Sequence, residues 1–276
     1  MSRLADLHIH TYYSDSTSSP EEVVEQARQN GLSCIAIVDH DTIDGVAPTV
    51  AAGAKYGLEV IPGIELSSEI NGKDVHILGY FIDCAHAQFS ARIKQMQGSR
   101  VGRMEEMISK LRPLGVNNIT LEEVAALAKS DSLGRPHLAK LLVAKGVVVD
   151  VRQAFDRFLS EGGPAYVSKF KQTPDEAIQL IRSAGGVAVL AHPVITAVDE
   201  LIPGFVQEGL GGIEVYYPNC SNNIIHFYEG IAQKHGLAVT GGSDAHGEAK
   251  RHTFVGKIKI PYDLVEKLRE KARQSI

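Results

Sequence analysis

The sequence predicts an α/β fold, more narrowly a β/α barrel. Short apolar runs alternate with amphipathic segments along most of the 276 residues, which is typical of parallel strands joined by helices. His, Asp or Glu directly follows several of these runs, and reactive groups in β/α barrels gather at the carboxyl ends of the strands. The chain is 44% hydrophobic and 22% charged, which suits one large core with an additional smaller lobe.

The first predicted strand, residues 3–7, runs directly into two histidines. His8 and His10 are two positions apart, so both side chains point to the same side of an extended chain. Two imidazoles that converge in this way can hold one metal ion together. Asp15 follows five positions after His10 and adds a carboxylate.

The next elements alternate as the barrel requires. Ser19, Pro20 and Glu22 form a capping box with a proline at the first helical position, which predicts a helix from Pro20 to about Asn30 that Gly31 ends. Two strands and one further helix are expected before residue 65: strand 34–38, helix 46–56 and strand 59–64.

Potential metal ligands follow most of these strands. A single histidine after a strand is more often a buried polar group or a surface residue. Six of the eleven histidines lie at such places, however, which indicates one shared site. Asp39 and Asp41 flank one of them and are expected to orient imidazoles. The candidates after the first strand are His40, Glu65, His192, Asp244 and His246, with His76 in the apolar stretch 75–81.

The second half of the chain returns to alternation. The predicted elements are helix 174–184, strand 187–191, helix 198–207, strand 213–216, helix 222–235, strand 238–242 and helix 262–273.

A helical, basic segment interrupts the barrel pattern. We expect a barrel of residues 1–91 and 172–276, and an inserted helical lobe of residues 92–171 that covers the site. Helices are predicted at 91–111, after a capping box at Thr120, and at 137–145 and 151–159. Residues 92–171 carry 14 Lys and Arg against 8 Asp and Glu, so the barrel is acidic. Such a lobe suits an anionic, phosphorylated substrate, although basic residues usually just solvate helix faces.

Within this lobe, Arg135 stands between Gly134 and Pro136. An arginine there can grip a phosphate at two points with its planar fork; alternatively, Pro136 begins a helix and Arg135 is exposed. His137 follows directly and is a second candidate for substrate binding. Lys169 is a third, where the chain returns to the barrel.

Composition also bears on the location of the protein. No stretch of about 18 apolar residues is present for a membrane span, and Met1 leads straight into the first strand without a signal peptide. We therefore expect a cytoplasmic protein with no membrane contact and no obligate protein partner. The three cysteines are widely spaced, which indicates neither disulfides nor a thiolate metal site.

The motifs resemble those of the polymerase and histidinol phosphatase (PHP) family. The resemblance covers residues 6 to 246 and rests on four motifs in order: Asp6 to Thr11 with Ser14-Asp15, Asp39-His40, Ala191-His192-Pro193, and Ser243 to His246. It implies a distorted seven-stranded (β/α)7 barrel with two or three divalent metals that hydrolyses phosphate esters. Residues 63–67, 76–80 and 134–137 resemble the small stand-alone branch, whose members include 3′,5′-nucleoside bisphosphate phosphatases and 5′-to-3′ exonucleases.

The resemblance also implies a ligand set for three metals. His8, His10, Glu65 and Asp244 would hold the first; Asp15, His40 and His246 the second; Glu65, His76 and His192 the third. Nitrogen and carboxylate ligands without thiolate suit manganese, iron or zinc. We favour manganese, with iron and zinc as alternatives.

The expected activity is that of a phosphoric ester hydrolase. A metal-bridged hydroxide would convert a nucleoside 3′,5′-bisphosphate to the 5′-monophosphate and phosphate, and His246 would contact the phosphate or assist the leaving oxygen. Three alternatives stay open: a 5′-3′ exonuclease on short RNA or DNA, a histidinol phosphatase, and a non-enzymatic metal-binding module. The low aromatic content of 6% leans against an extended channel for single strands.

Overall fold

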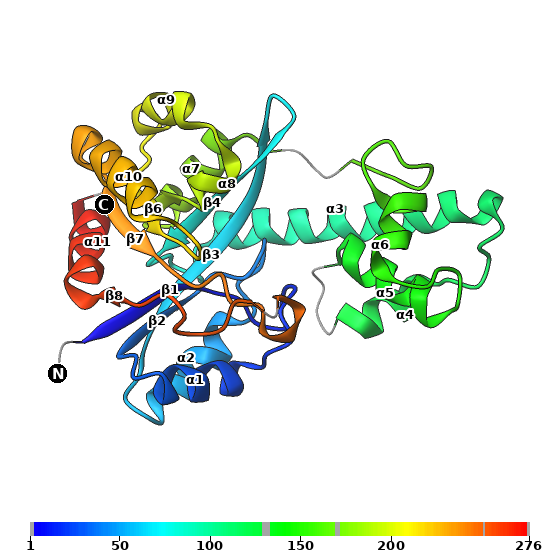
Figure 1. Cartoon of the computed structure of the whole chain (residues 1–276), viewed down its shortest axis with the longest axis horizontal. Helices are drawn as coiled ribbons and strands as arrows, with labels where there is room; N and C mark the ends of the chain where they lie inside the picture. The colour runs from blue at the N-terminus through cyan, green and yellow to red at the C-terminus, as the bar shows by residue number, and fades with distance from the viewer. Residues whose placement is uncertain (1–2, 129–132, 169–171, 251, 275–276) are drawn as a thin grey trace.

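The computed structural model describes residues 3–128, 133–168, 172–250 and 252–274. Among these residues, eight strands form one sheet in the order β7-β6-β5-β4-β3-β2-β1-β8. The sheet curls into a nearly closed barrel with helices on its outside (Figure 1), so the predicted β/α barrel is confirmed. The strands are β1 (Leu4–Ile9), β2 (Cys34–Ile37), β3 (Glu59–Ile70), β4 (Lys73–Tyr80), β5 (Val187–Leu190), β6 (Gly212–Tyr216), β7 (Ala238–Gly241) and the short β8 (Ile260–Pro261).

The helices around the barrel lie close to their predicted positions. The capping box at Ser19 forms as the sequence predicts and begins the first helix. The helix expected over 198–207 divides instead into a 3-10 turn and a short α-helix. The elements are α1 (Pro20–Gln29), α2 (Val46–Ala54), α7 (Pro174–Ser183), α8 (Pro193–Thr196), η3 (Asp199–Leu201), α9 (Ile202–Gln207), α10 (Asn222–His235), η4 (Gly247–Lys250) and α11 (Tyr262–Gln274).

Strand direction differs from the all-parallel expectation. β4 is antiparallel to both β3 and β5, and β8 is antiparallel to β1. For β4 the cause is a hairpin at Asn71 and Gly72, whose φ angles of 53° and 79° are those of a two-residue turn that matches strand twist. β3 therefore does not end before Glu65 but continues to Ile70.

The barrel closes where β1 approaches the chain that follows β7. The backbone N–H of His10 donates to the carbonyl of Ala245 at 3.0 Å, and Ile9 forms a bridge with Ala245. Gly242 makes this approach feasible, since a Cβ at this position would lie 2.3 Å from the backbone nitrogen of His8. Because glycine has no side chain here, the segment after β7 that carries Asp244 and His246 can lie directly against β1, which carries His8 and His10.

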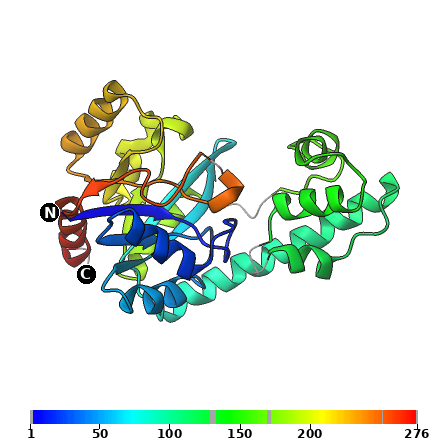
Figure 2. The ribbon, with the colours of Figure 1, turned by 60° about the horizontal axis from the view of Figure 1, so that its bottom comes forward.

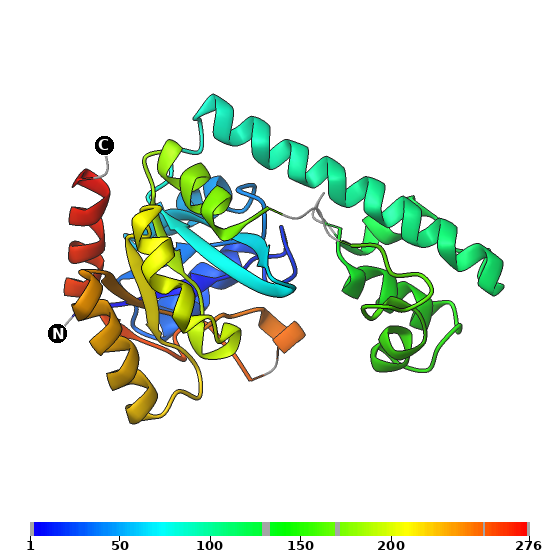
Figure 3. The same ribbon diagram turned by 90° about the horizontal axis from the view of Figure 1, so that it is seen from above.

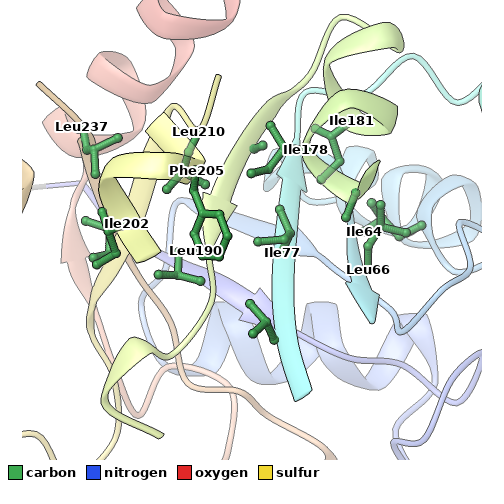
Figure 4. Close-up of a cluster of buried hydrophobic side chains, with 14 of the residues drawn as sticks. Ile64, Leu66, Ile77, Ile178, Ile181, Leu190, Ile202, Phe205, Leu210 and Leu237 are labelled. Carbon is green, nitrogen blue, oxygen red and sulfur yellow. The ribbon is translucent and has the colours of Figure 1, made fainter. Parts of the chain in front are cut away.

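Apolar clusters pack on both sides of the sheet. One fills the space between β3, β4 and β5 and the helices α7 and α9, with Ile64, Ile77 and Phe205 at its centre (Figure 4). Another joins inward-facing side chains of β1, β2 and β5 to Val265 and Leu268 of α11. Since α11 packs near the first residues of these strands, it covers the end of the barrel opposite the histidines.

A group of helices lies beside the barrel and has its own apolar core. These helices are α3 (Ala87–Leu111), η1 (Arg112–Leu114), α4 (Leu121–Ala128), α5 (Arg135–Ala144) and α6 (Val151–Ala154), followed by a single π-helical turn, η2 (Phe155–Leu159). We call the part from Met104 to Leu159 the helical lobe. Figures 2 and 3 show α3 running from the barrel into this lobe. We propose residues 92–171 as the bounds of the insertion.

The helix α3 packs against both the barrel and the helical lobe. Its first half buries Phe89, Ile93 and Met96 against the barrel, and its second half buries Met104 and Met107 in the lobe. It begins at Ala87, earlier than predicted, because His86 caps it by accepting a hydrogen bond from the backbone of Phe89. None of the helices within the described ranges is long and apolar enough to cross a bilayer.

We expect Gly242→Ala to destabilise the protein by about 1–3 kcal/mol, because the added methyl group meets backbone that cannot move aside. Gly98→Ala is the matched control. A Cβ at Gly98, on the exposed side of α3, has no atom within 4 Å, so alanine there should be neutral or stabilise by up to about 1 kcal/mol. Thermal unfolding of both variants measures the difference, and equal melting temperatures would contradict the proposed close approach.

Candidate metal centre

The side chains predicted as metal ligands gather at the mouth of the barrel. Each comes from a strand or from the loop that follows one, so residues far apart in sequence meet here. His8 and His10 lie on β1, Asp15 in the next loop, His40 after β2, Glu65 on β3, His76 on β4, His192 after β5, and Asp244 and His246 after β7.

Glu65 occupies the centre of this cluster and is 1% exposed. Its two carboxylate oxygens point to different groups of imidazoles. Oε2 lies 3.2 Å from Nε2 of His8, 3.2 Å from Nε2 of His10 and 3.4 Å from Nδ1 of His40, whereas Oε1 lies 2.8 Å from Nδ1 of His76 and 3.1 Å from Nε2 of His192. A bridging position of Glu65 between two metals fits this division.

A second group of ligand atoms surrounds Asp15. Its Oδ1 lies 3.1 Å from Nε2 of His246, and its Oδ2 lies 4.0 Å from Nε2 of His40. The ring of His10 stacks on that of His246 with centroids 4.0 Å apart. Asp15 is more exposed than the other ligands, so this group faces the opening of the site.

Asp244 presents its two oxygens to opposite sides. Oδ1 lies 3.4 Å from Nε2 of His10 and 3.3 Å from Nδ1 of His246. Oδ2 accepts hydrogen bonds from the hydroxyl of Tyr217 at 2.7 Å and from Nζ of Lys250 at 2.9 Å. One oxygen is thus fixed by protein donors while the other faces the imidazoles.

The electrostatics of the cluster favour positive charge. Burial would raise the pKa of Glu65, but the imidazoles of His40, His8 and His76 outweigh burial and hold it well below its usual value. Burial would likewise lower the pKa of His10, yet the carboxylates of Asp244 and Glu65 raise it to about 9. Divalent cations would satisfy the same carboxylates that here retain protons on imidazoles.

The residues fit divalent metal ions. Ligand atoms fall into three groups within 4.8 Å: His10, Asp15, His40 and His246; His8, His10 and Glu65; and His40, Glu65 and His76. Across the described part of the chain, neither ring nitrogen of the buried His10 has an aligned hydrogen-bond partner, which is a costly state for a purely structural histidine. The donors are nitrogen and oxygen, as manganese, iron and zinc accept.

A carboxylate that sequence reasoning missed orients one of the imidazoles. Asp39 accepts hydrogen bonds from Thr11 and Ser14, and Asp41 accepts from the backbone of Ser67 and from Arg100. These contacts hold the loops that carry the ligands, and the expectation that the two aspartates orient imidazoles stays a prediction. Glu214 of β6 has this role, with Oε1 2.9 Å from Nδ1 of His8. The sequence signal that could have identified Glu214 is a glutamate within an otherwise apolar strand.

A cavity of about 220 Å³ opens between this cluster and the helical lobe. Its barrel side carries acidic and imidazole groups. The opposite side carries Arg135 of the helical lobe together with Arg100 and Arg103 of α3, two arginines that sequence reasoning missed. The lining residues are Ser14, Asp15, His40, Ser67, His76, Arg100, Arg103, Gly134, Arg135, Pro136, His137 and Phe155.

The predicted substrate-binding residues divide into three cases. Arg135 is the first residue of α5, lines the cavity and donates from Nη1 to the carbonyl of Leu159 at 3.0 Å. His137 also lines the cavity, and its Nδ1 accepts the backbone N–H of Gly134 at 3.2 Å. Lys169 lies outside the described residues. Both alternatives considered for Arg135 are therefore seen together: Pro136 lies in the first turn of a helix, and Arg135 lines the cavity.

Arg103 has a hydrogen-bond donor that could bind an anion in the cavity. Its Nε donates to the carbonyl of Val167 at 2.7 Å, but its buried Nη2 has no hydrogen-bond partner among the residues that the structure describes. Burial, and then the neighbouring charge of Arg135, lower its pKa. An anion in the cavity would satisfy this donor and relieve the repulsion.

Comparison with known proteins agrees with this site. The model of the PHP domain matches residues 6–184. A 3′,5′-nucleoside bisphosphate phosphatase from Chromobacterium violaceum is 33% identical over 91% of this chain and 90% of its own length. A 5′-3′ exoribonuclease from Haemophilus influenzae is 35% identical over 78% of this chain and 80% of its own. A crystal structure from Bifidobacterium adolescentis, assigned as a metal-dependent phosphoesterase, superposes with a TM-score of 0.85 at 32% identity and covers 97% of this chain and 96% of its own.

We expect His10→Ala to weaken Mn²⁺ binding strongly, because His10 adjoins both Glu65 and Asp15. His226→Ala, an exposed histidine on α10, is the control and should bind like the unaltered protein. Saturating Mn²⁺ at about 100 times its Kd should stabilise the unaltered protein by about 2.7 kcal/mol per site. Titration calorimetry and thermal unfolding measure both effects, and equal binding by the two variants would remove His10 from the site.

Proposed function

The chain belongs to the PHP family and hydrolyses phosphoric esters with divalent metals, and we propose that its substrate is a nucleoside 3′,5′-bisphosphate. The products would be the nucleoside 5′-monophosphate and phosphate. One observation carries this proposal: a single cavity has a metal-binding cluster at one end and three arginines at the other. A molecule with two phosphates can contact both ends at once.

Divalent metals held at the barrel mouth would stabilise charge on the reacting phosphoryl group and acidify a water molecule near neutral pH. We propose His8, His10, Asp15, His40, Glu65, His76, His192, Asp244 and His246 as the residues that hold them, with three ions and manganese as the favoured metal.

His246 has a further role in this proposal. Its Nδ1–H donates to the carbonyl of Asp244 at 2.9 Å, which fixes the ring. The opposite nitrogen, Nε2, lies 3.1 Å from Asp15 Oδ1 and faces the group of ligands that opens to the cavity. Because Nδ1–H is engaged, only Nε2 is available: it would either hold a metal or, when protonated and not bound to metal, contact the phosphate or give its proton to the leaving oxygen.

The arginines would bind the phosphate that does not react. Arg103 supplies a buried donor without a partner among the described residues, and Arg135 and His137 line the same wall. Arg100 is paired with Asp41, which fixes its position between barrel and lobe. Charge-assisted hydrogen bonds of this kind contribute about 1.5–3 kcal/mol each.

The main alternative substrate is a short oligonucleotide, degraded from its 5′ end. The similarity to the exoribonuclease from Haemophilus influenzae favours it. In that case the arginines would contact the 5′-phosphate of the strand and not a second phosphate of a single nucleotide. Both substrates need the same metals, so the reaction rates must distinguish them.

We expect the manganese-loaded protein to release phosphate from a nucleoside 3′,5′-bisphosphate faster than from a nucleoside 5′-monophosphate or histidinol phosphate, and faster than it releases mononucleotides from a 5′-phosphorylated RNA of a few residues. Initial rates at equal concentrations measure this preference. Faster mononucleotide release from the RNA would make the protein a nuclease, and a preference for histidinol phosphate would give the third assignment.

Removing an arginine from the cavity should weaken binding of the second phosphate selectively. We expect Arg103→Gln to raise KM for a nucleoside 3′,5′-bisphosphate by about 10- to 100-fold, with little change for the 3′-monophosphate, and Arg135→Ala to act in the same direction. Arg157→Gln, an exposed arginine of the lobe outside the cavity, is the control. Equal losses on both substrates would exclude a second-phosphate role.

A further inference from the structure

Strand β6 contributes none of the nine proposed ligands, yet one side chain within it and one directly after it contact ligands from other strands. Glu214 lies within the strand and Tyr217 directly follows it. The ligands that both residues contact lie at the mouth of the barrel.

Glu214 connects two histidines. It is 1% exposed, its Oε1 accepts Nδ1–H of His8 at 2.9 Å, and its Oε2 accepts the backbone N–H of His192 at 2.8 Å. A carboxylate offers only acceptors, so the proton of His8 is on Nδ1. The other nitrogen, Nε2, lies 3.2 Å from Oε2 of Glu65 and is the atom of His8 that would bind a metal.

Tyr217 acts on two other ligands. Its hydroxyl donates to Oδ2 of Asp244 at 2.7 Å, which leaves Oδ1 for the imidazole side. Its ring packs edge-on against the ring of His192, with centroids 5.6 Å apart at 62°. Asp244 has a φ of 49°, a backbone conformation that costs energy in a non-glycine residue and persists only where its surroundings impose it.

We propose that Glu214 and Tyr217 are positioning residues of the metal centre, which fix His8, His192 and Asp244 in the orientation that binds metal. The inference rests on the proposed metal centre but not on the proposed substrate. Three strands, β1, β5 and β7, thus depend on β6 for the placement of their ligands. Groups that orient metal ligands typically account for 10- to 100-fold in metal affinity.

The chain offers a matched control for each variant. Glu214→Gln keeps the shape but cannot accept at both ends, because its amide nitrogen is a donor. Its control is Thr240→Val, since Thr240 is fully buried and pairs with Glu214 across β6 and β7. Tyr217→Phe removes one hydroxyl without altering a buried charge. Its control is Tyr216→Phe, whose hydroxyl donates to Glu229 at 2.6 Å, away from the ligands.

The experiment measures Mn²⁺ affinity of the full chain by competition with a fluorescent chelator, together with the melting temperature of the metal-free protein. We expect about 10- to 100-fold weaker Mn²⁺ binding for Glu214→Gln. Tyr217→Phe should lose less, because Lys250 still holds Asp244. Both variants should melt near their controls when free of metal, and kcat should fall with KM for the bisphosphate nearly unchanged.

Two results would overturn the inference. Mn²⁺ affinities equal to those of the controls would leave both residues without a positioning role. If a variant also loses stability when free of metal, and this loss alone accounts for its weaker Mn²⁺ binding, the residue has only a structural role. If the unaltered protein binds Mn²⁺ but does not cleave the bisphosphate, the substrate proposal fails and the positioning test stands; if it binds no Mn²⁺, the metal centre and this inference fail together.

Discussion

The burial of Glu65 constrains the arrangement around it. A carboxylate that is 1% exposed is stable only beside donors or cations. Its backbone is held on both sides, since its N–H donates to Asp39 and its carbonyl accepts from Asp41. Its oxygens lie among imidazoles from four strands or their following loops. A register shift of one residue in any contributing strand would turn its side chains to the other face and leave the charge unpaired.

Element order and most helix boundaries were predictable because local chemistry specifies them. Ser19 caps α1 through its own side chain, and no distant contact is needed for that. Strand direction is different, because it depends on which segments pair. The antiparallel β4 arises from the turn at Asn71 and Gly72, a recognisable hairpin signal. The hairpin was missed because Glu65 was assumed to mark the end of its strand, whereas β3 continues past this residue.

The same distinction applies to the site. Residues that directly follow apolar runs were found from sequence because strand ends meet in a barrel. Glu214 lies within such a run, where a single strand does not reveal its partner. Arg100 and Arg103 lie on a long amphipathic helix, and basic residues there usually solvate an exposed face. They line the cavity only because α3 packs on the barrel with its first half and reaches the lobe with its second.

Opposite charges at the two walls of the cavity have a consequence for selectivity. The carboxylates of the barrel mouth require cations, whereas Arg103 and Arg135 place two positive charges on the other wall, which an anion would offset. On the proposed function, a bisphosphate meets both requirements, because one phosphate contacts the metals and the other the arginines. A monophosphate satisfies only one wall. Since α3 connects both parts, contacts to the unreactive phosphate can hold the reacting one in place, which converts binding energy into rate.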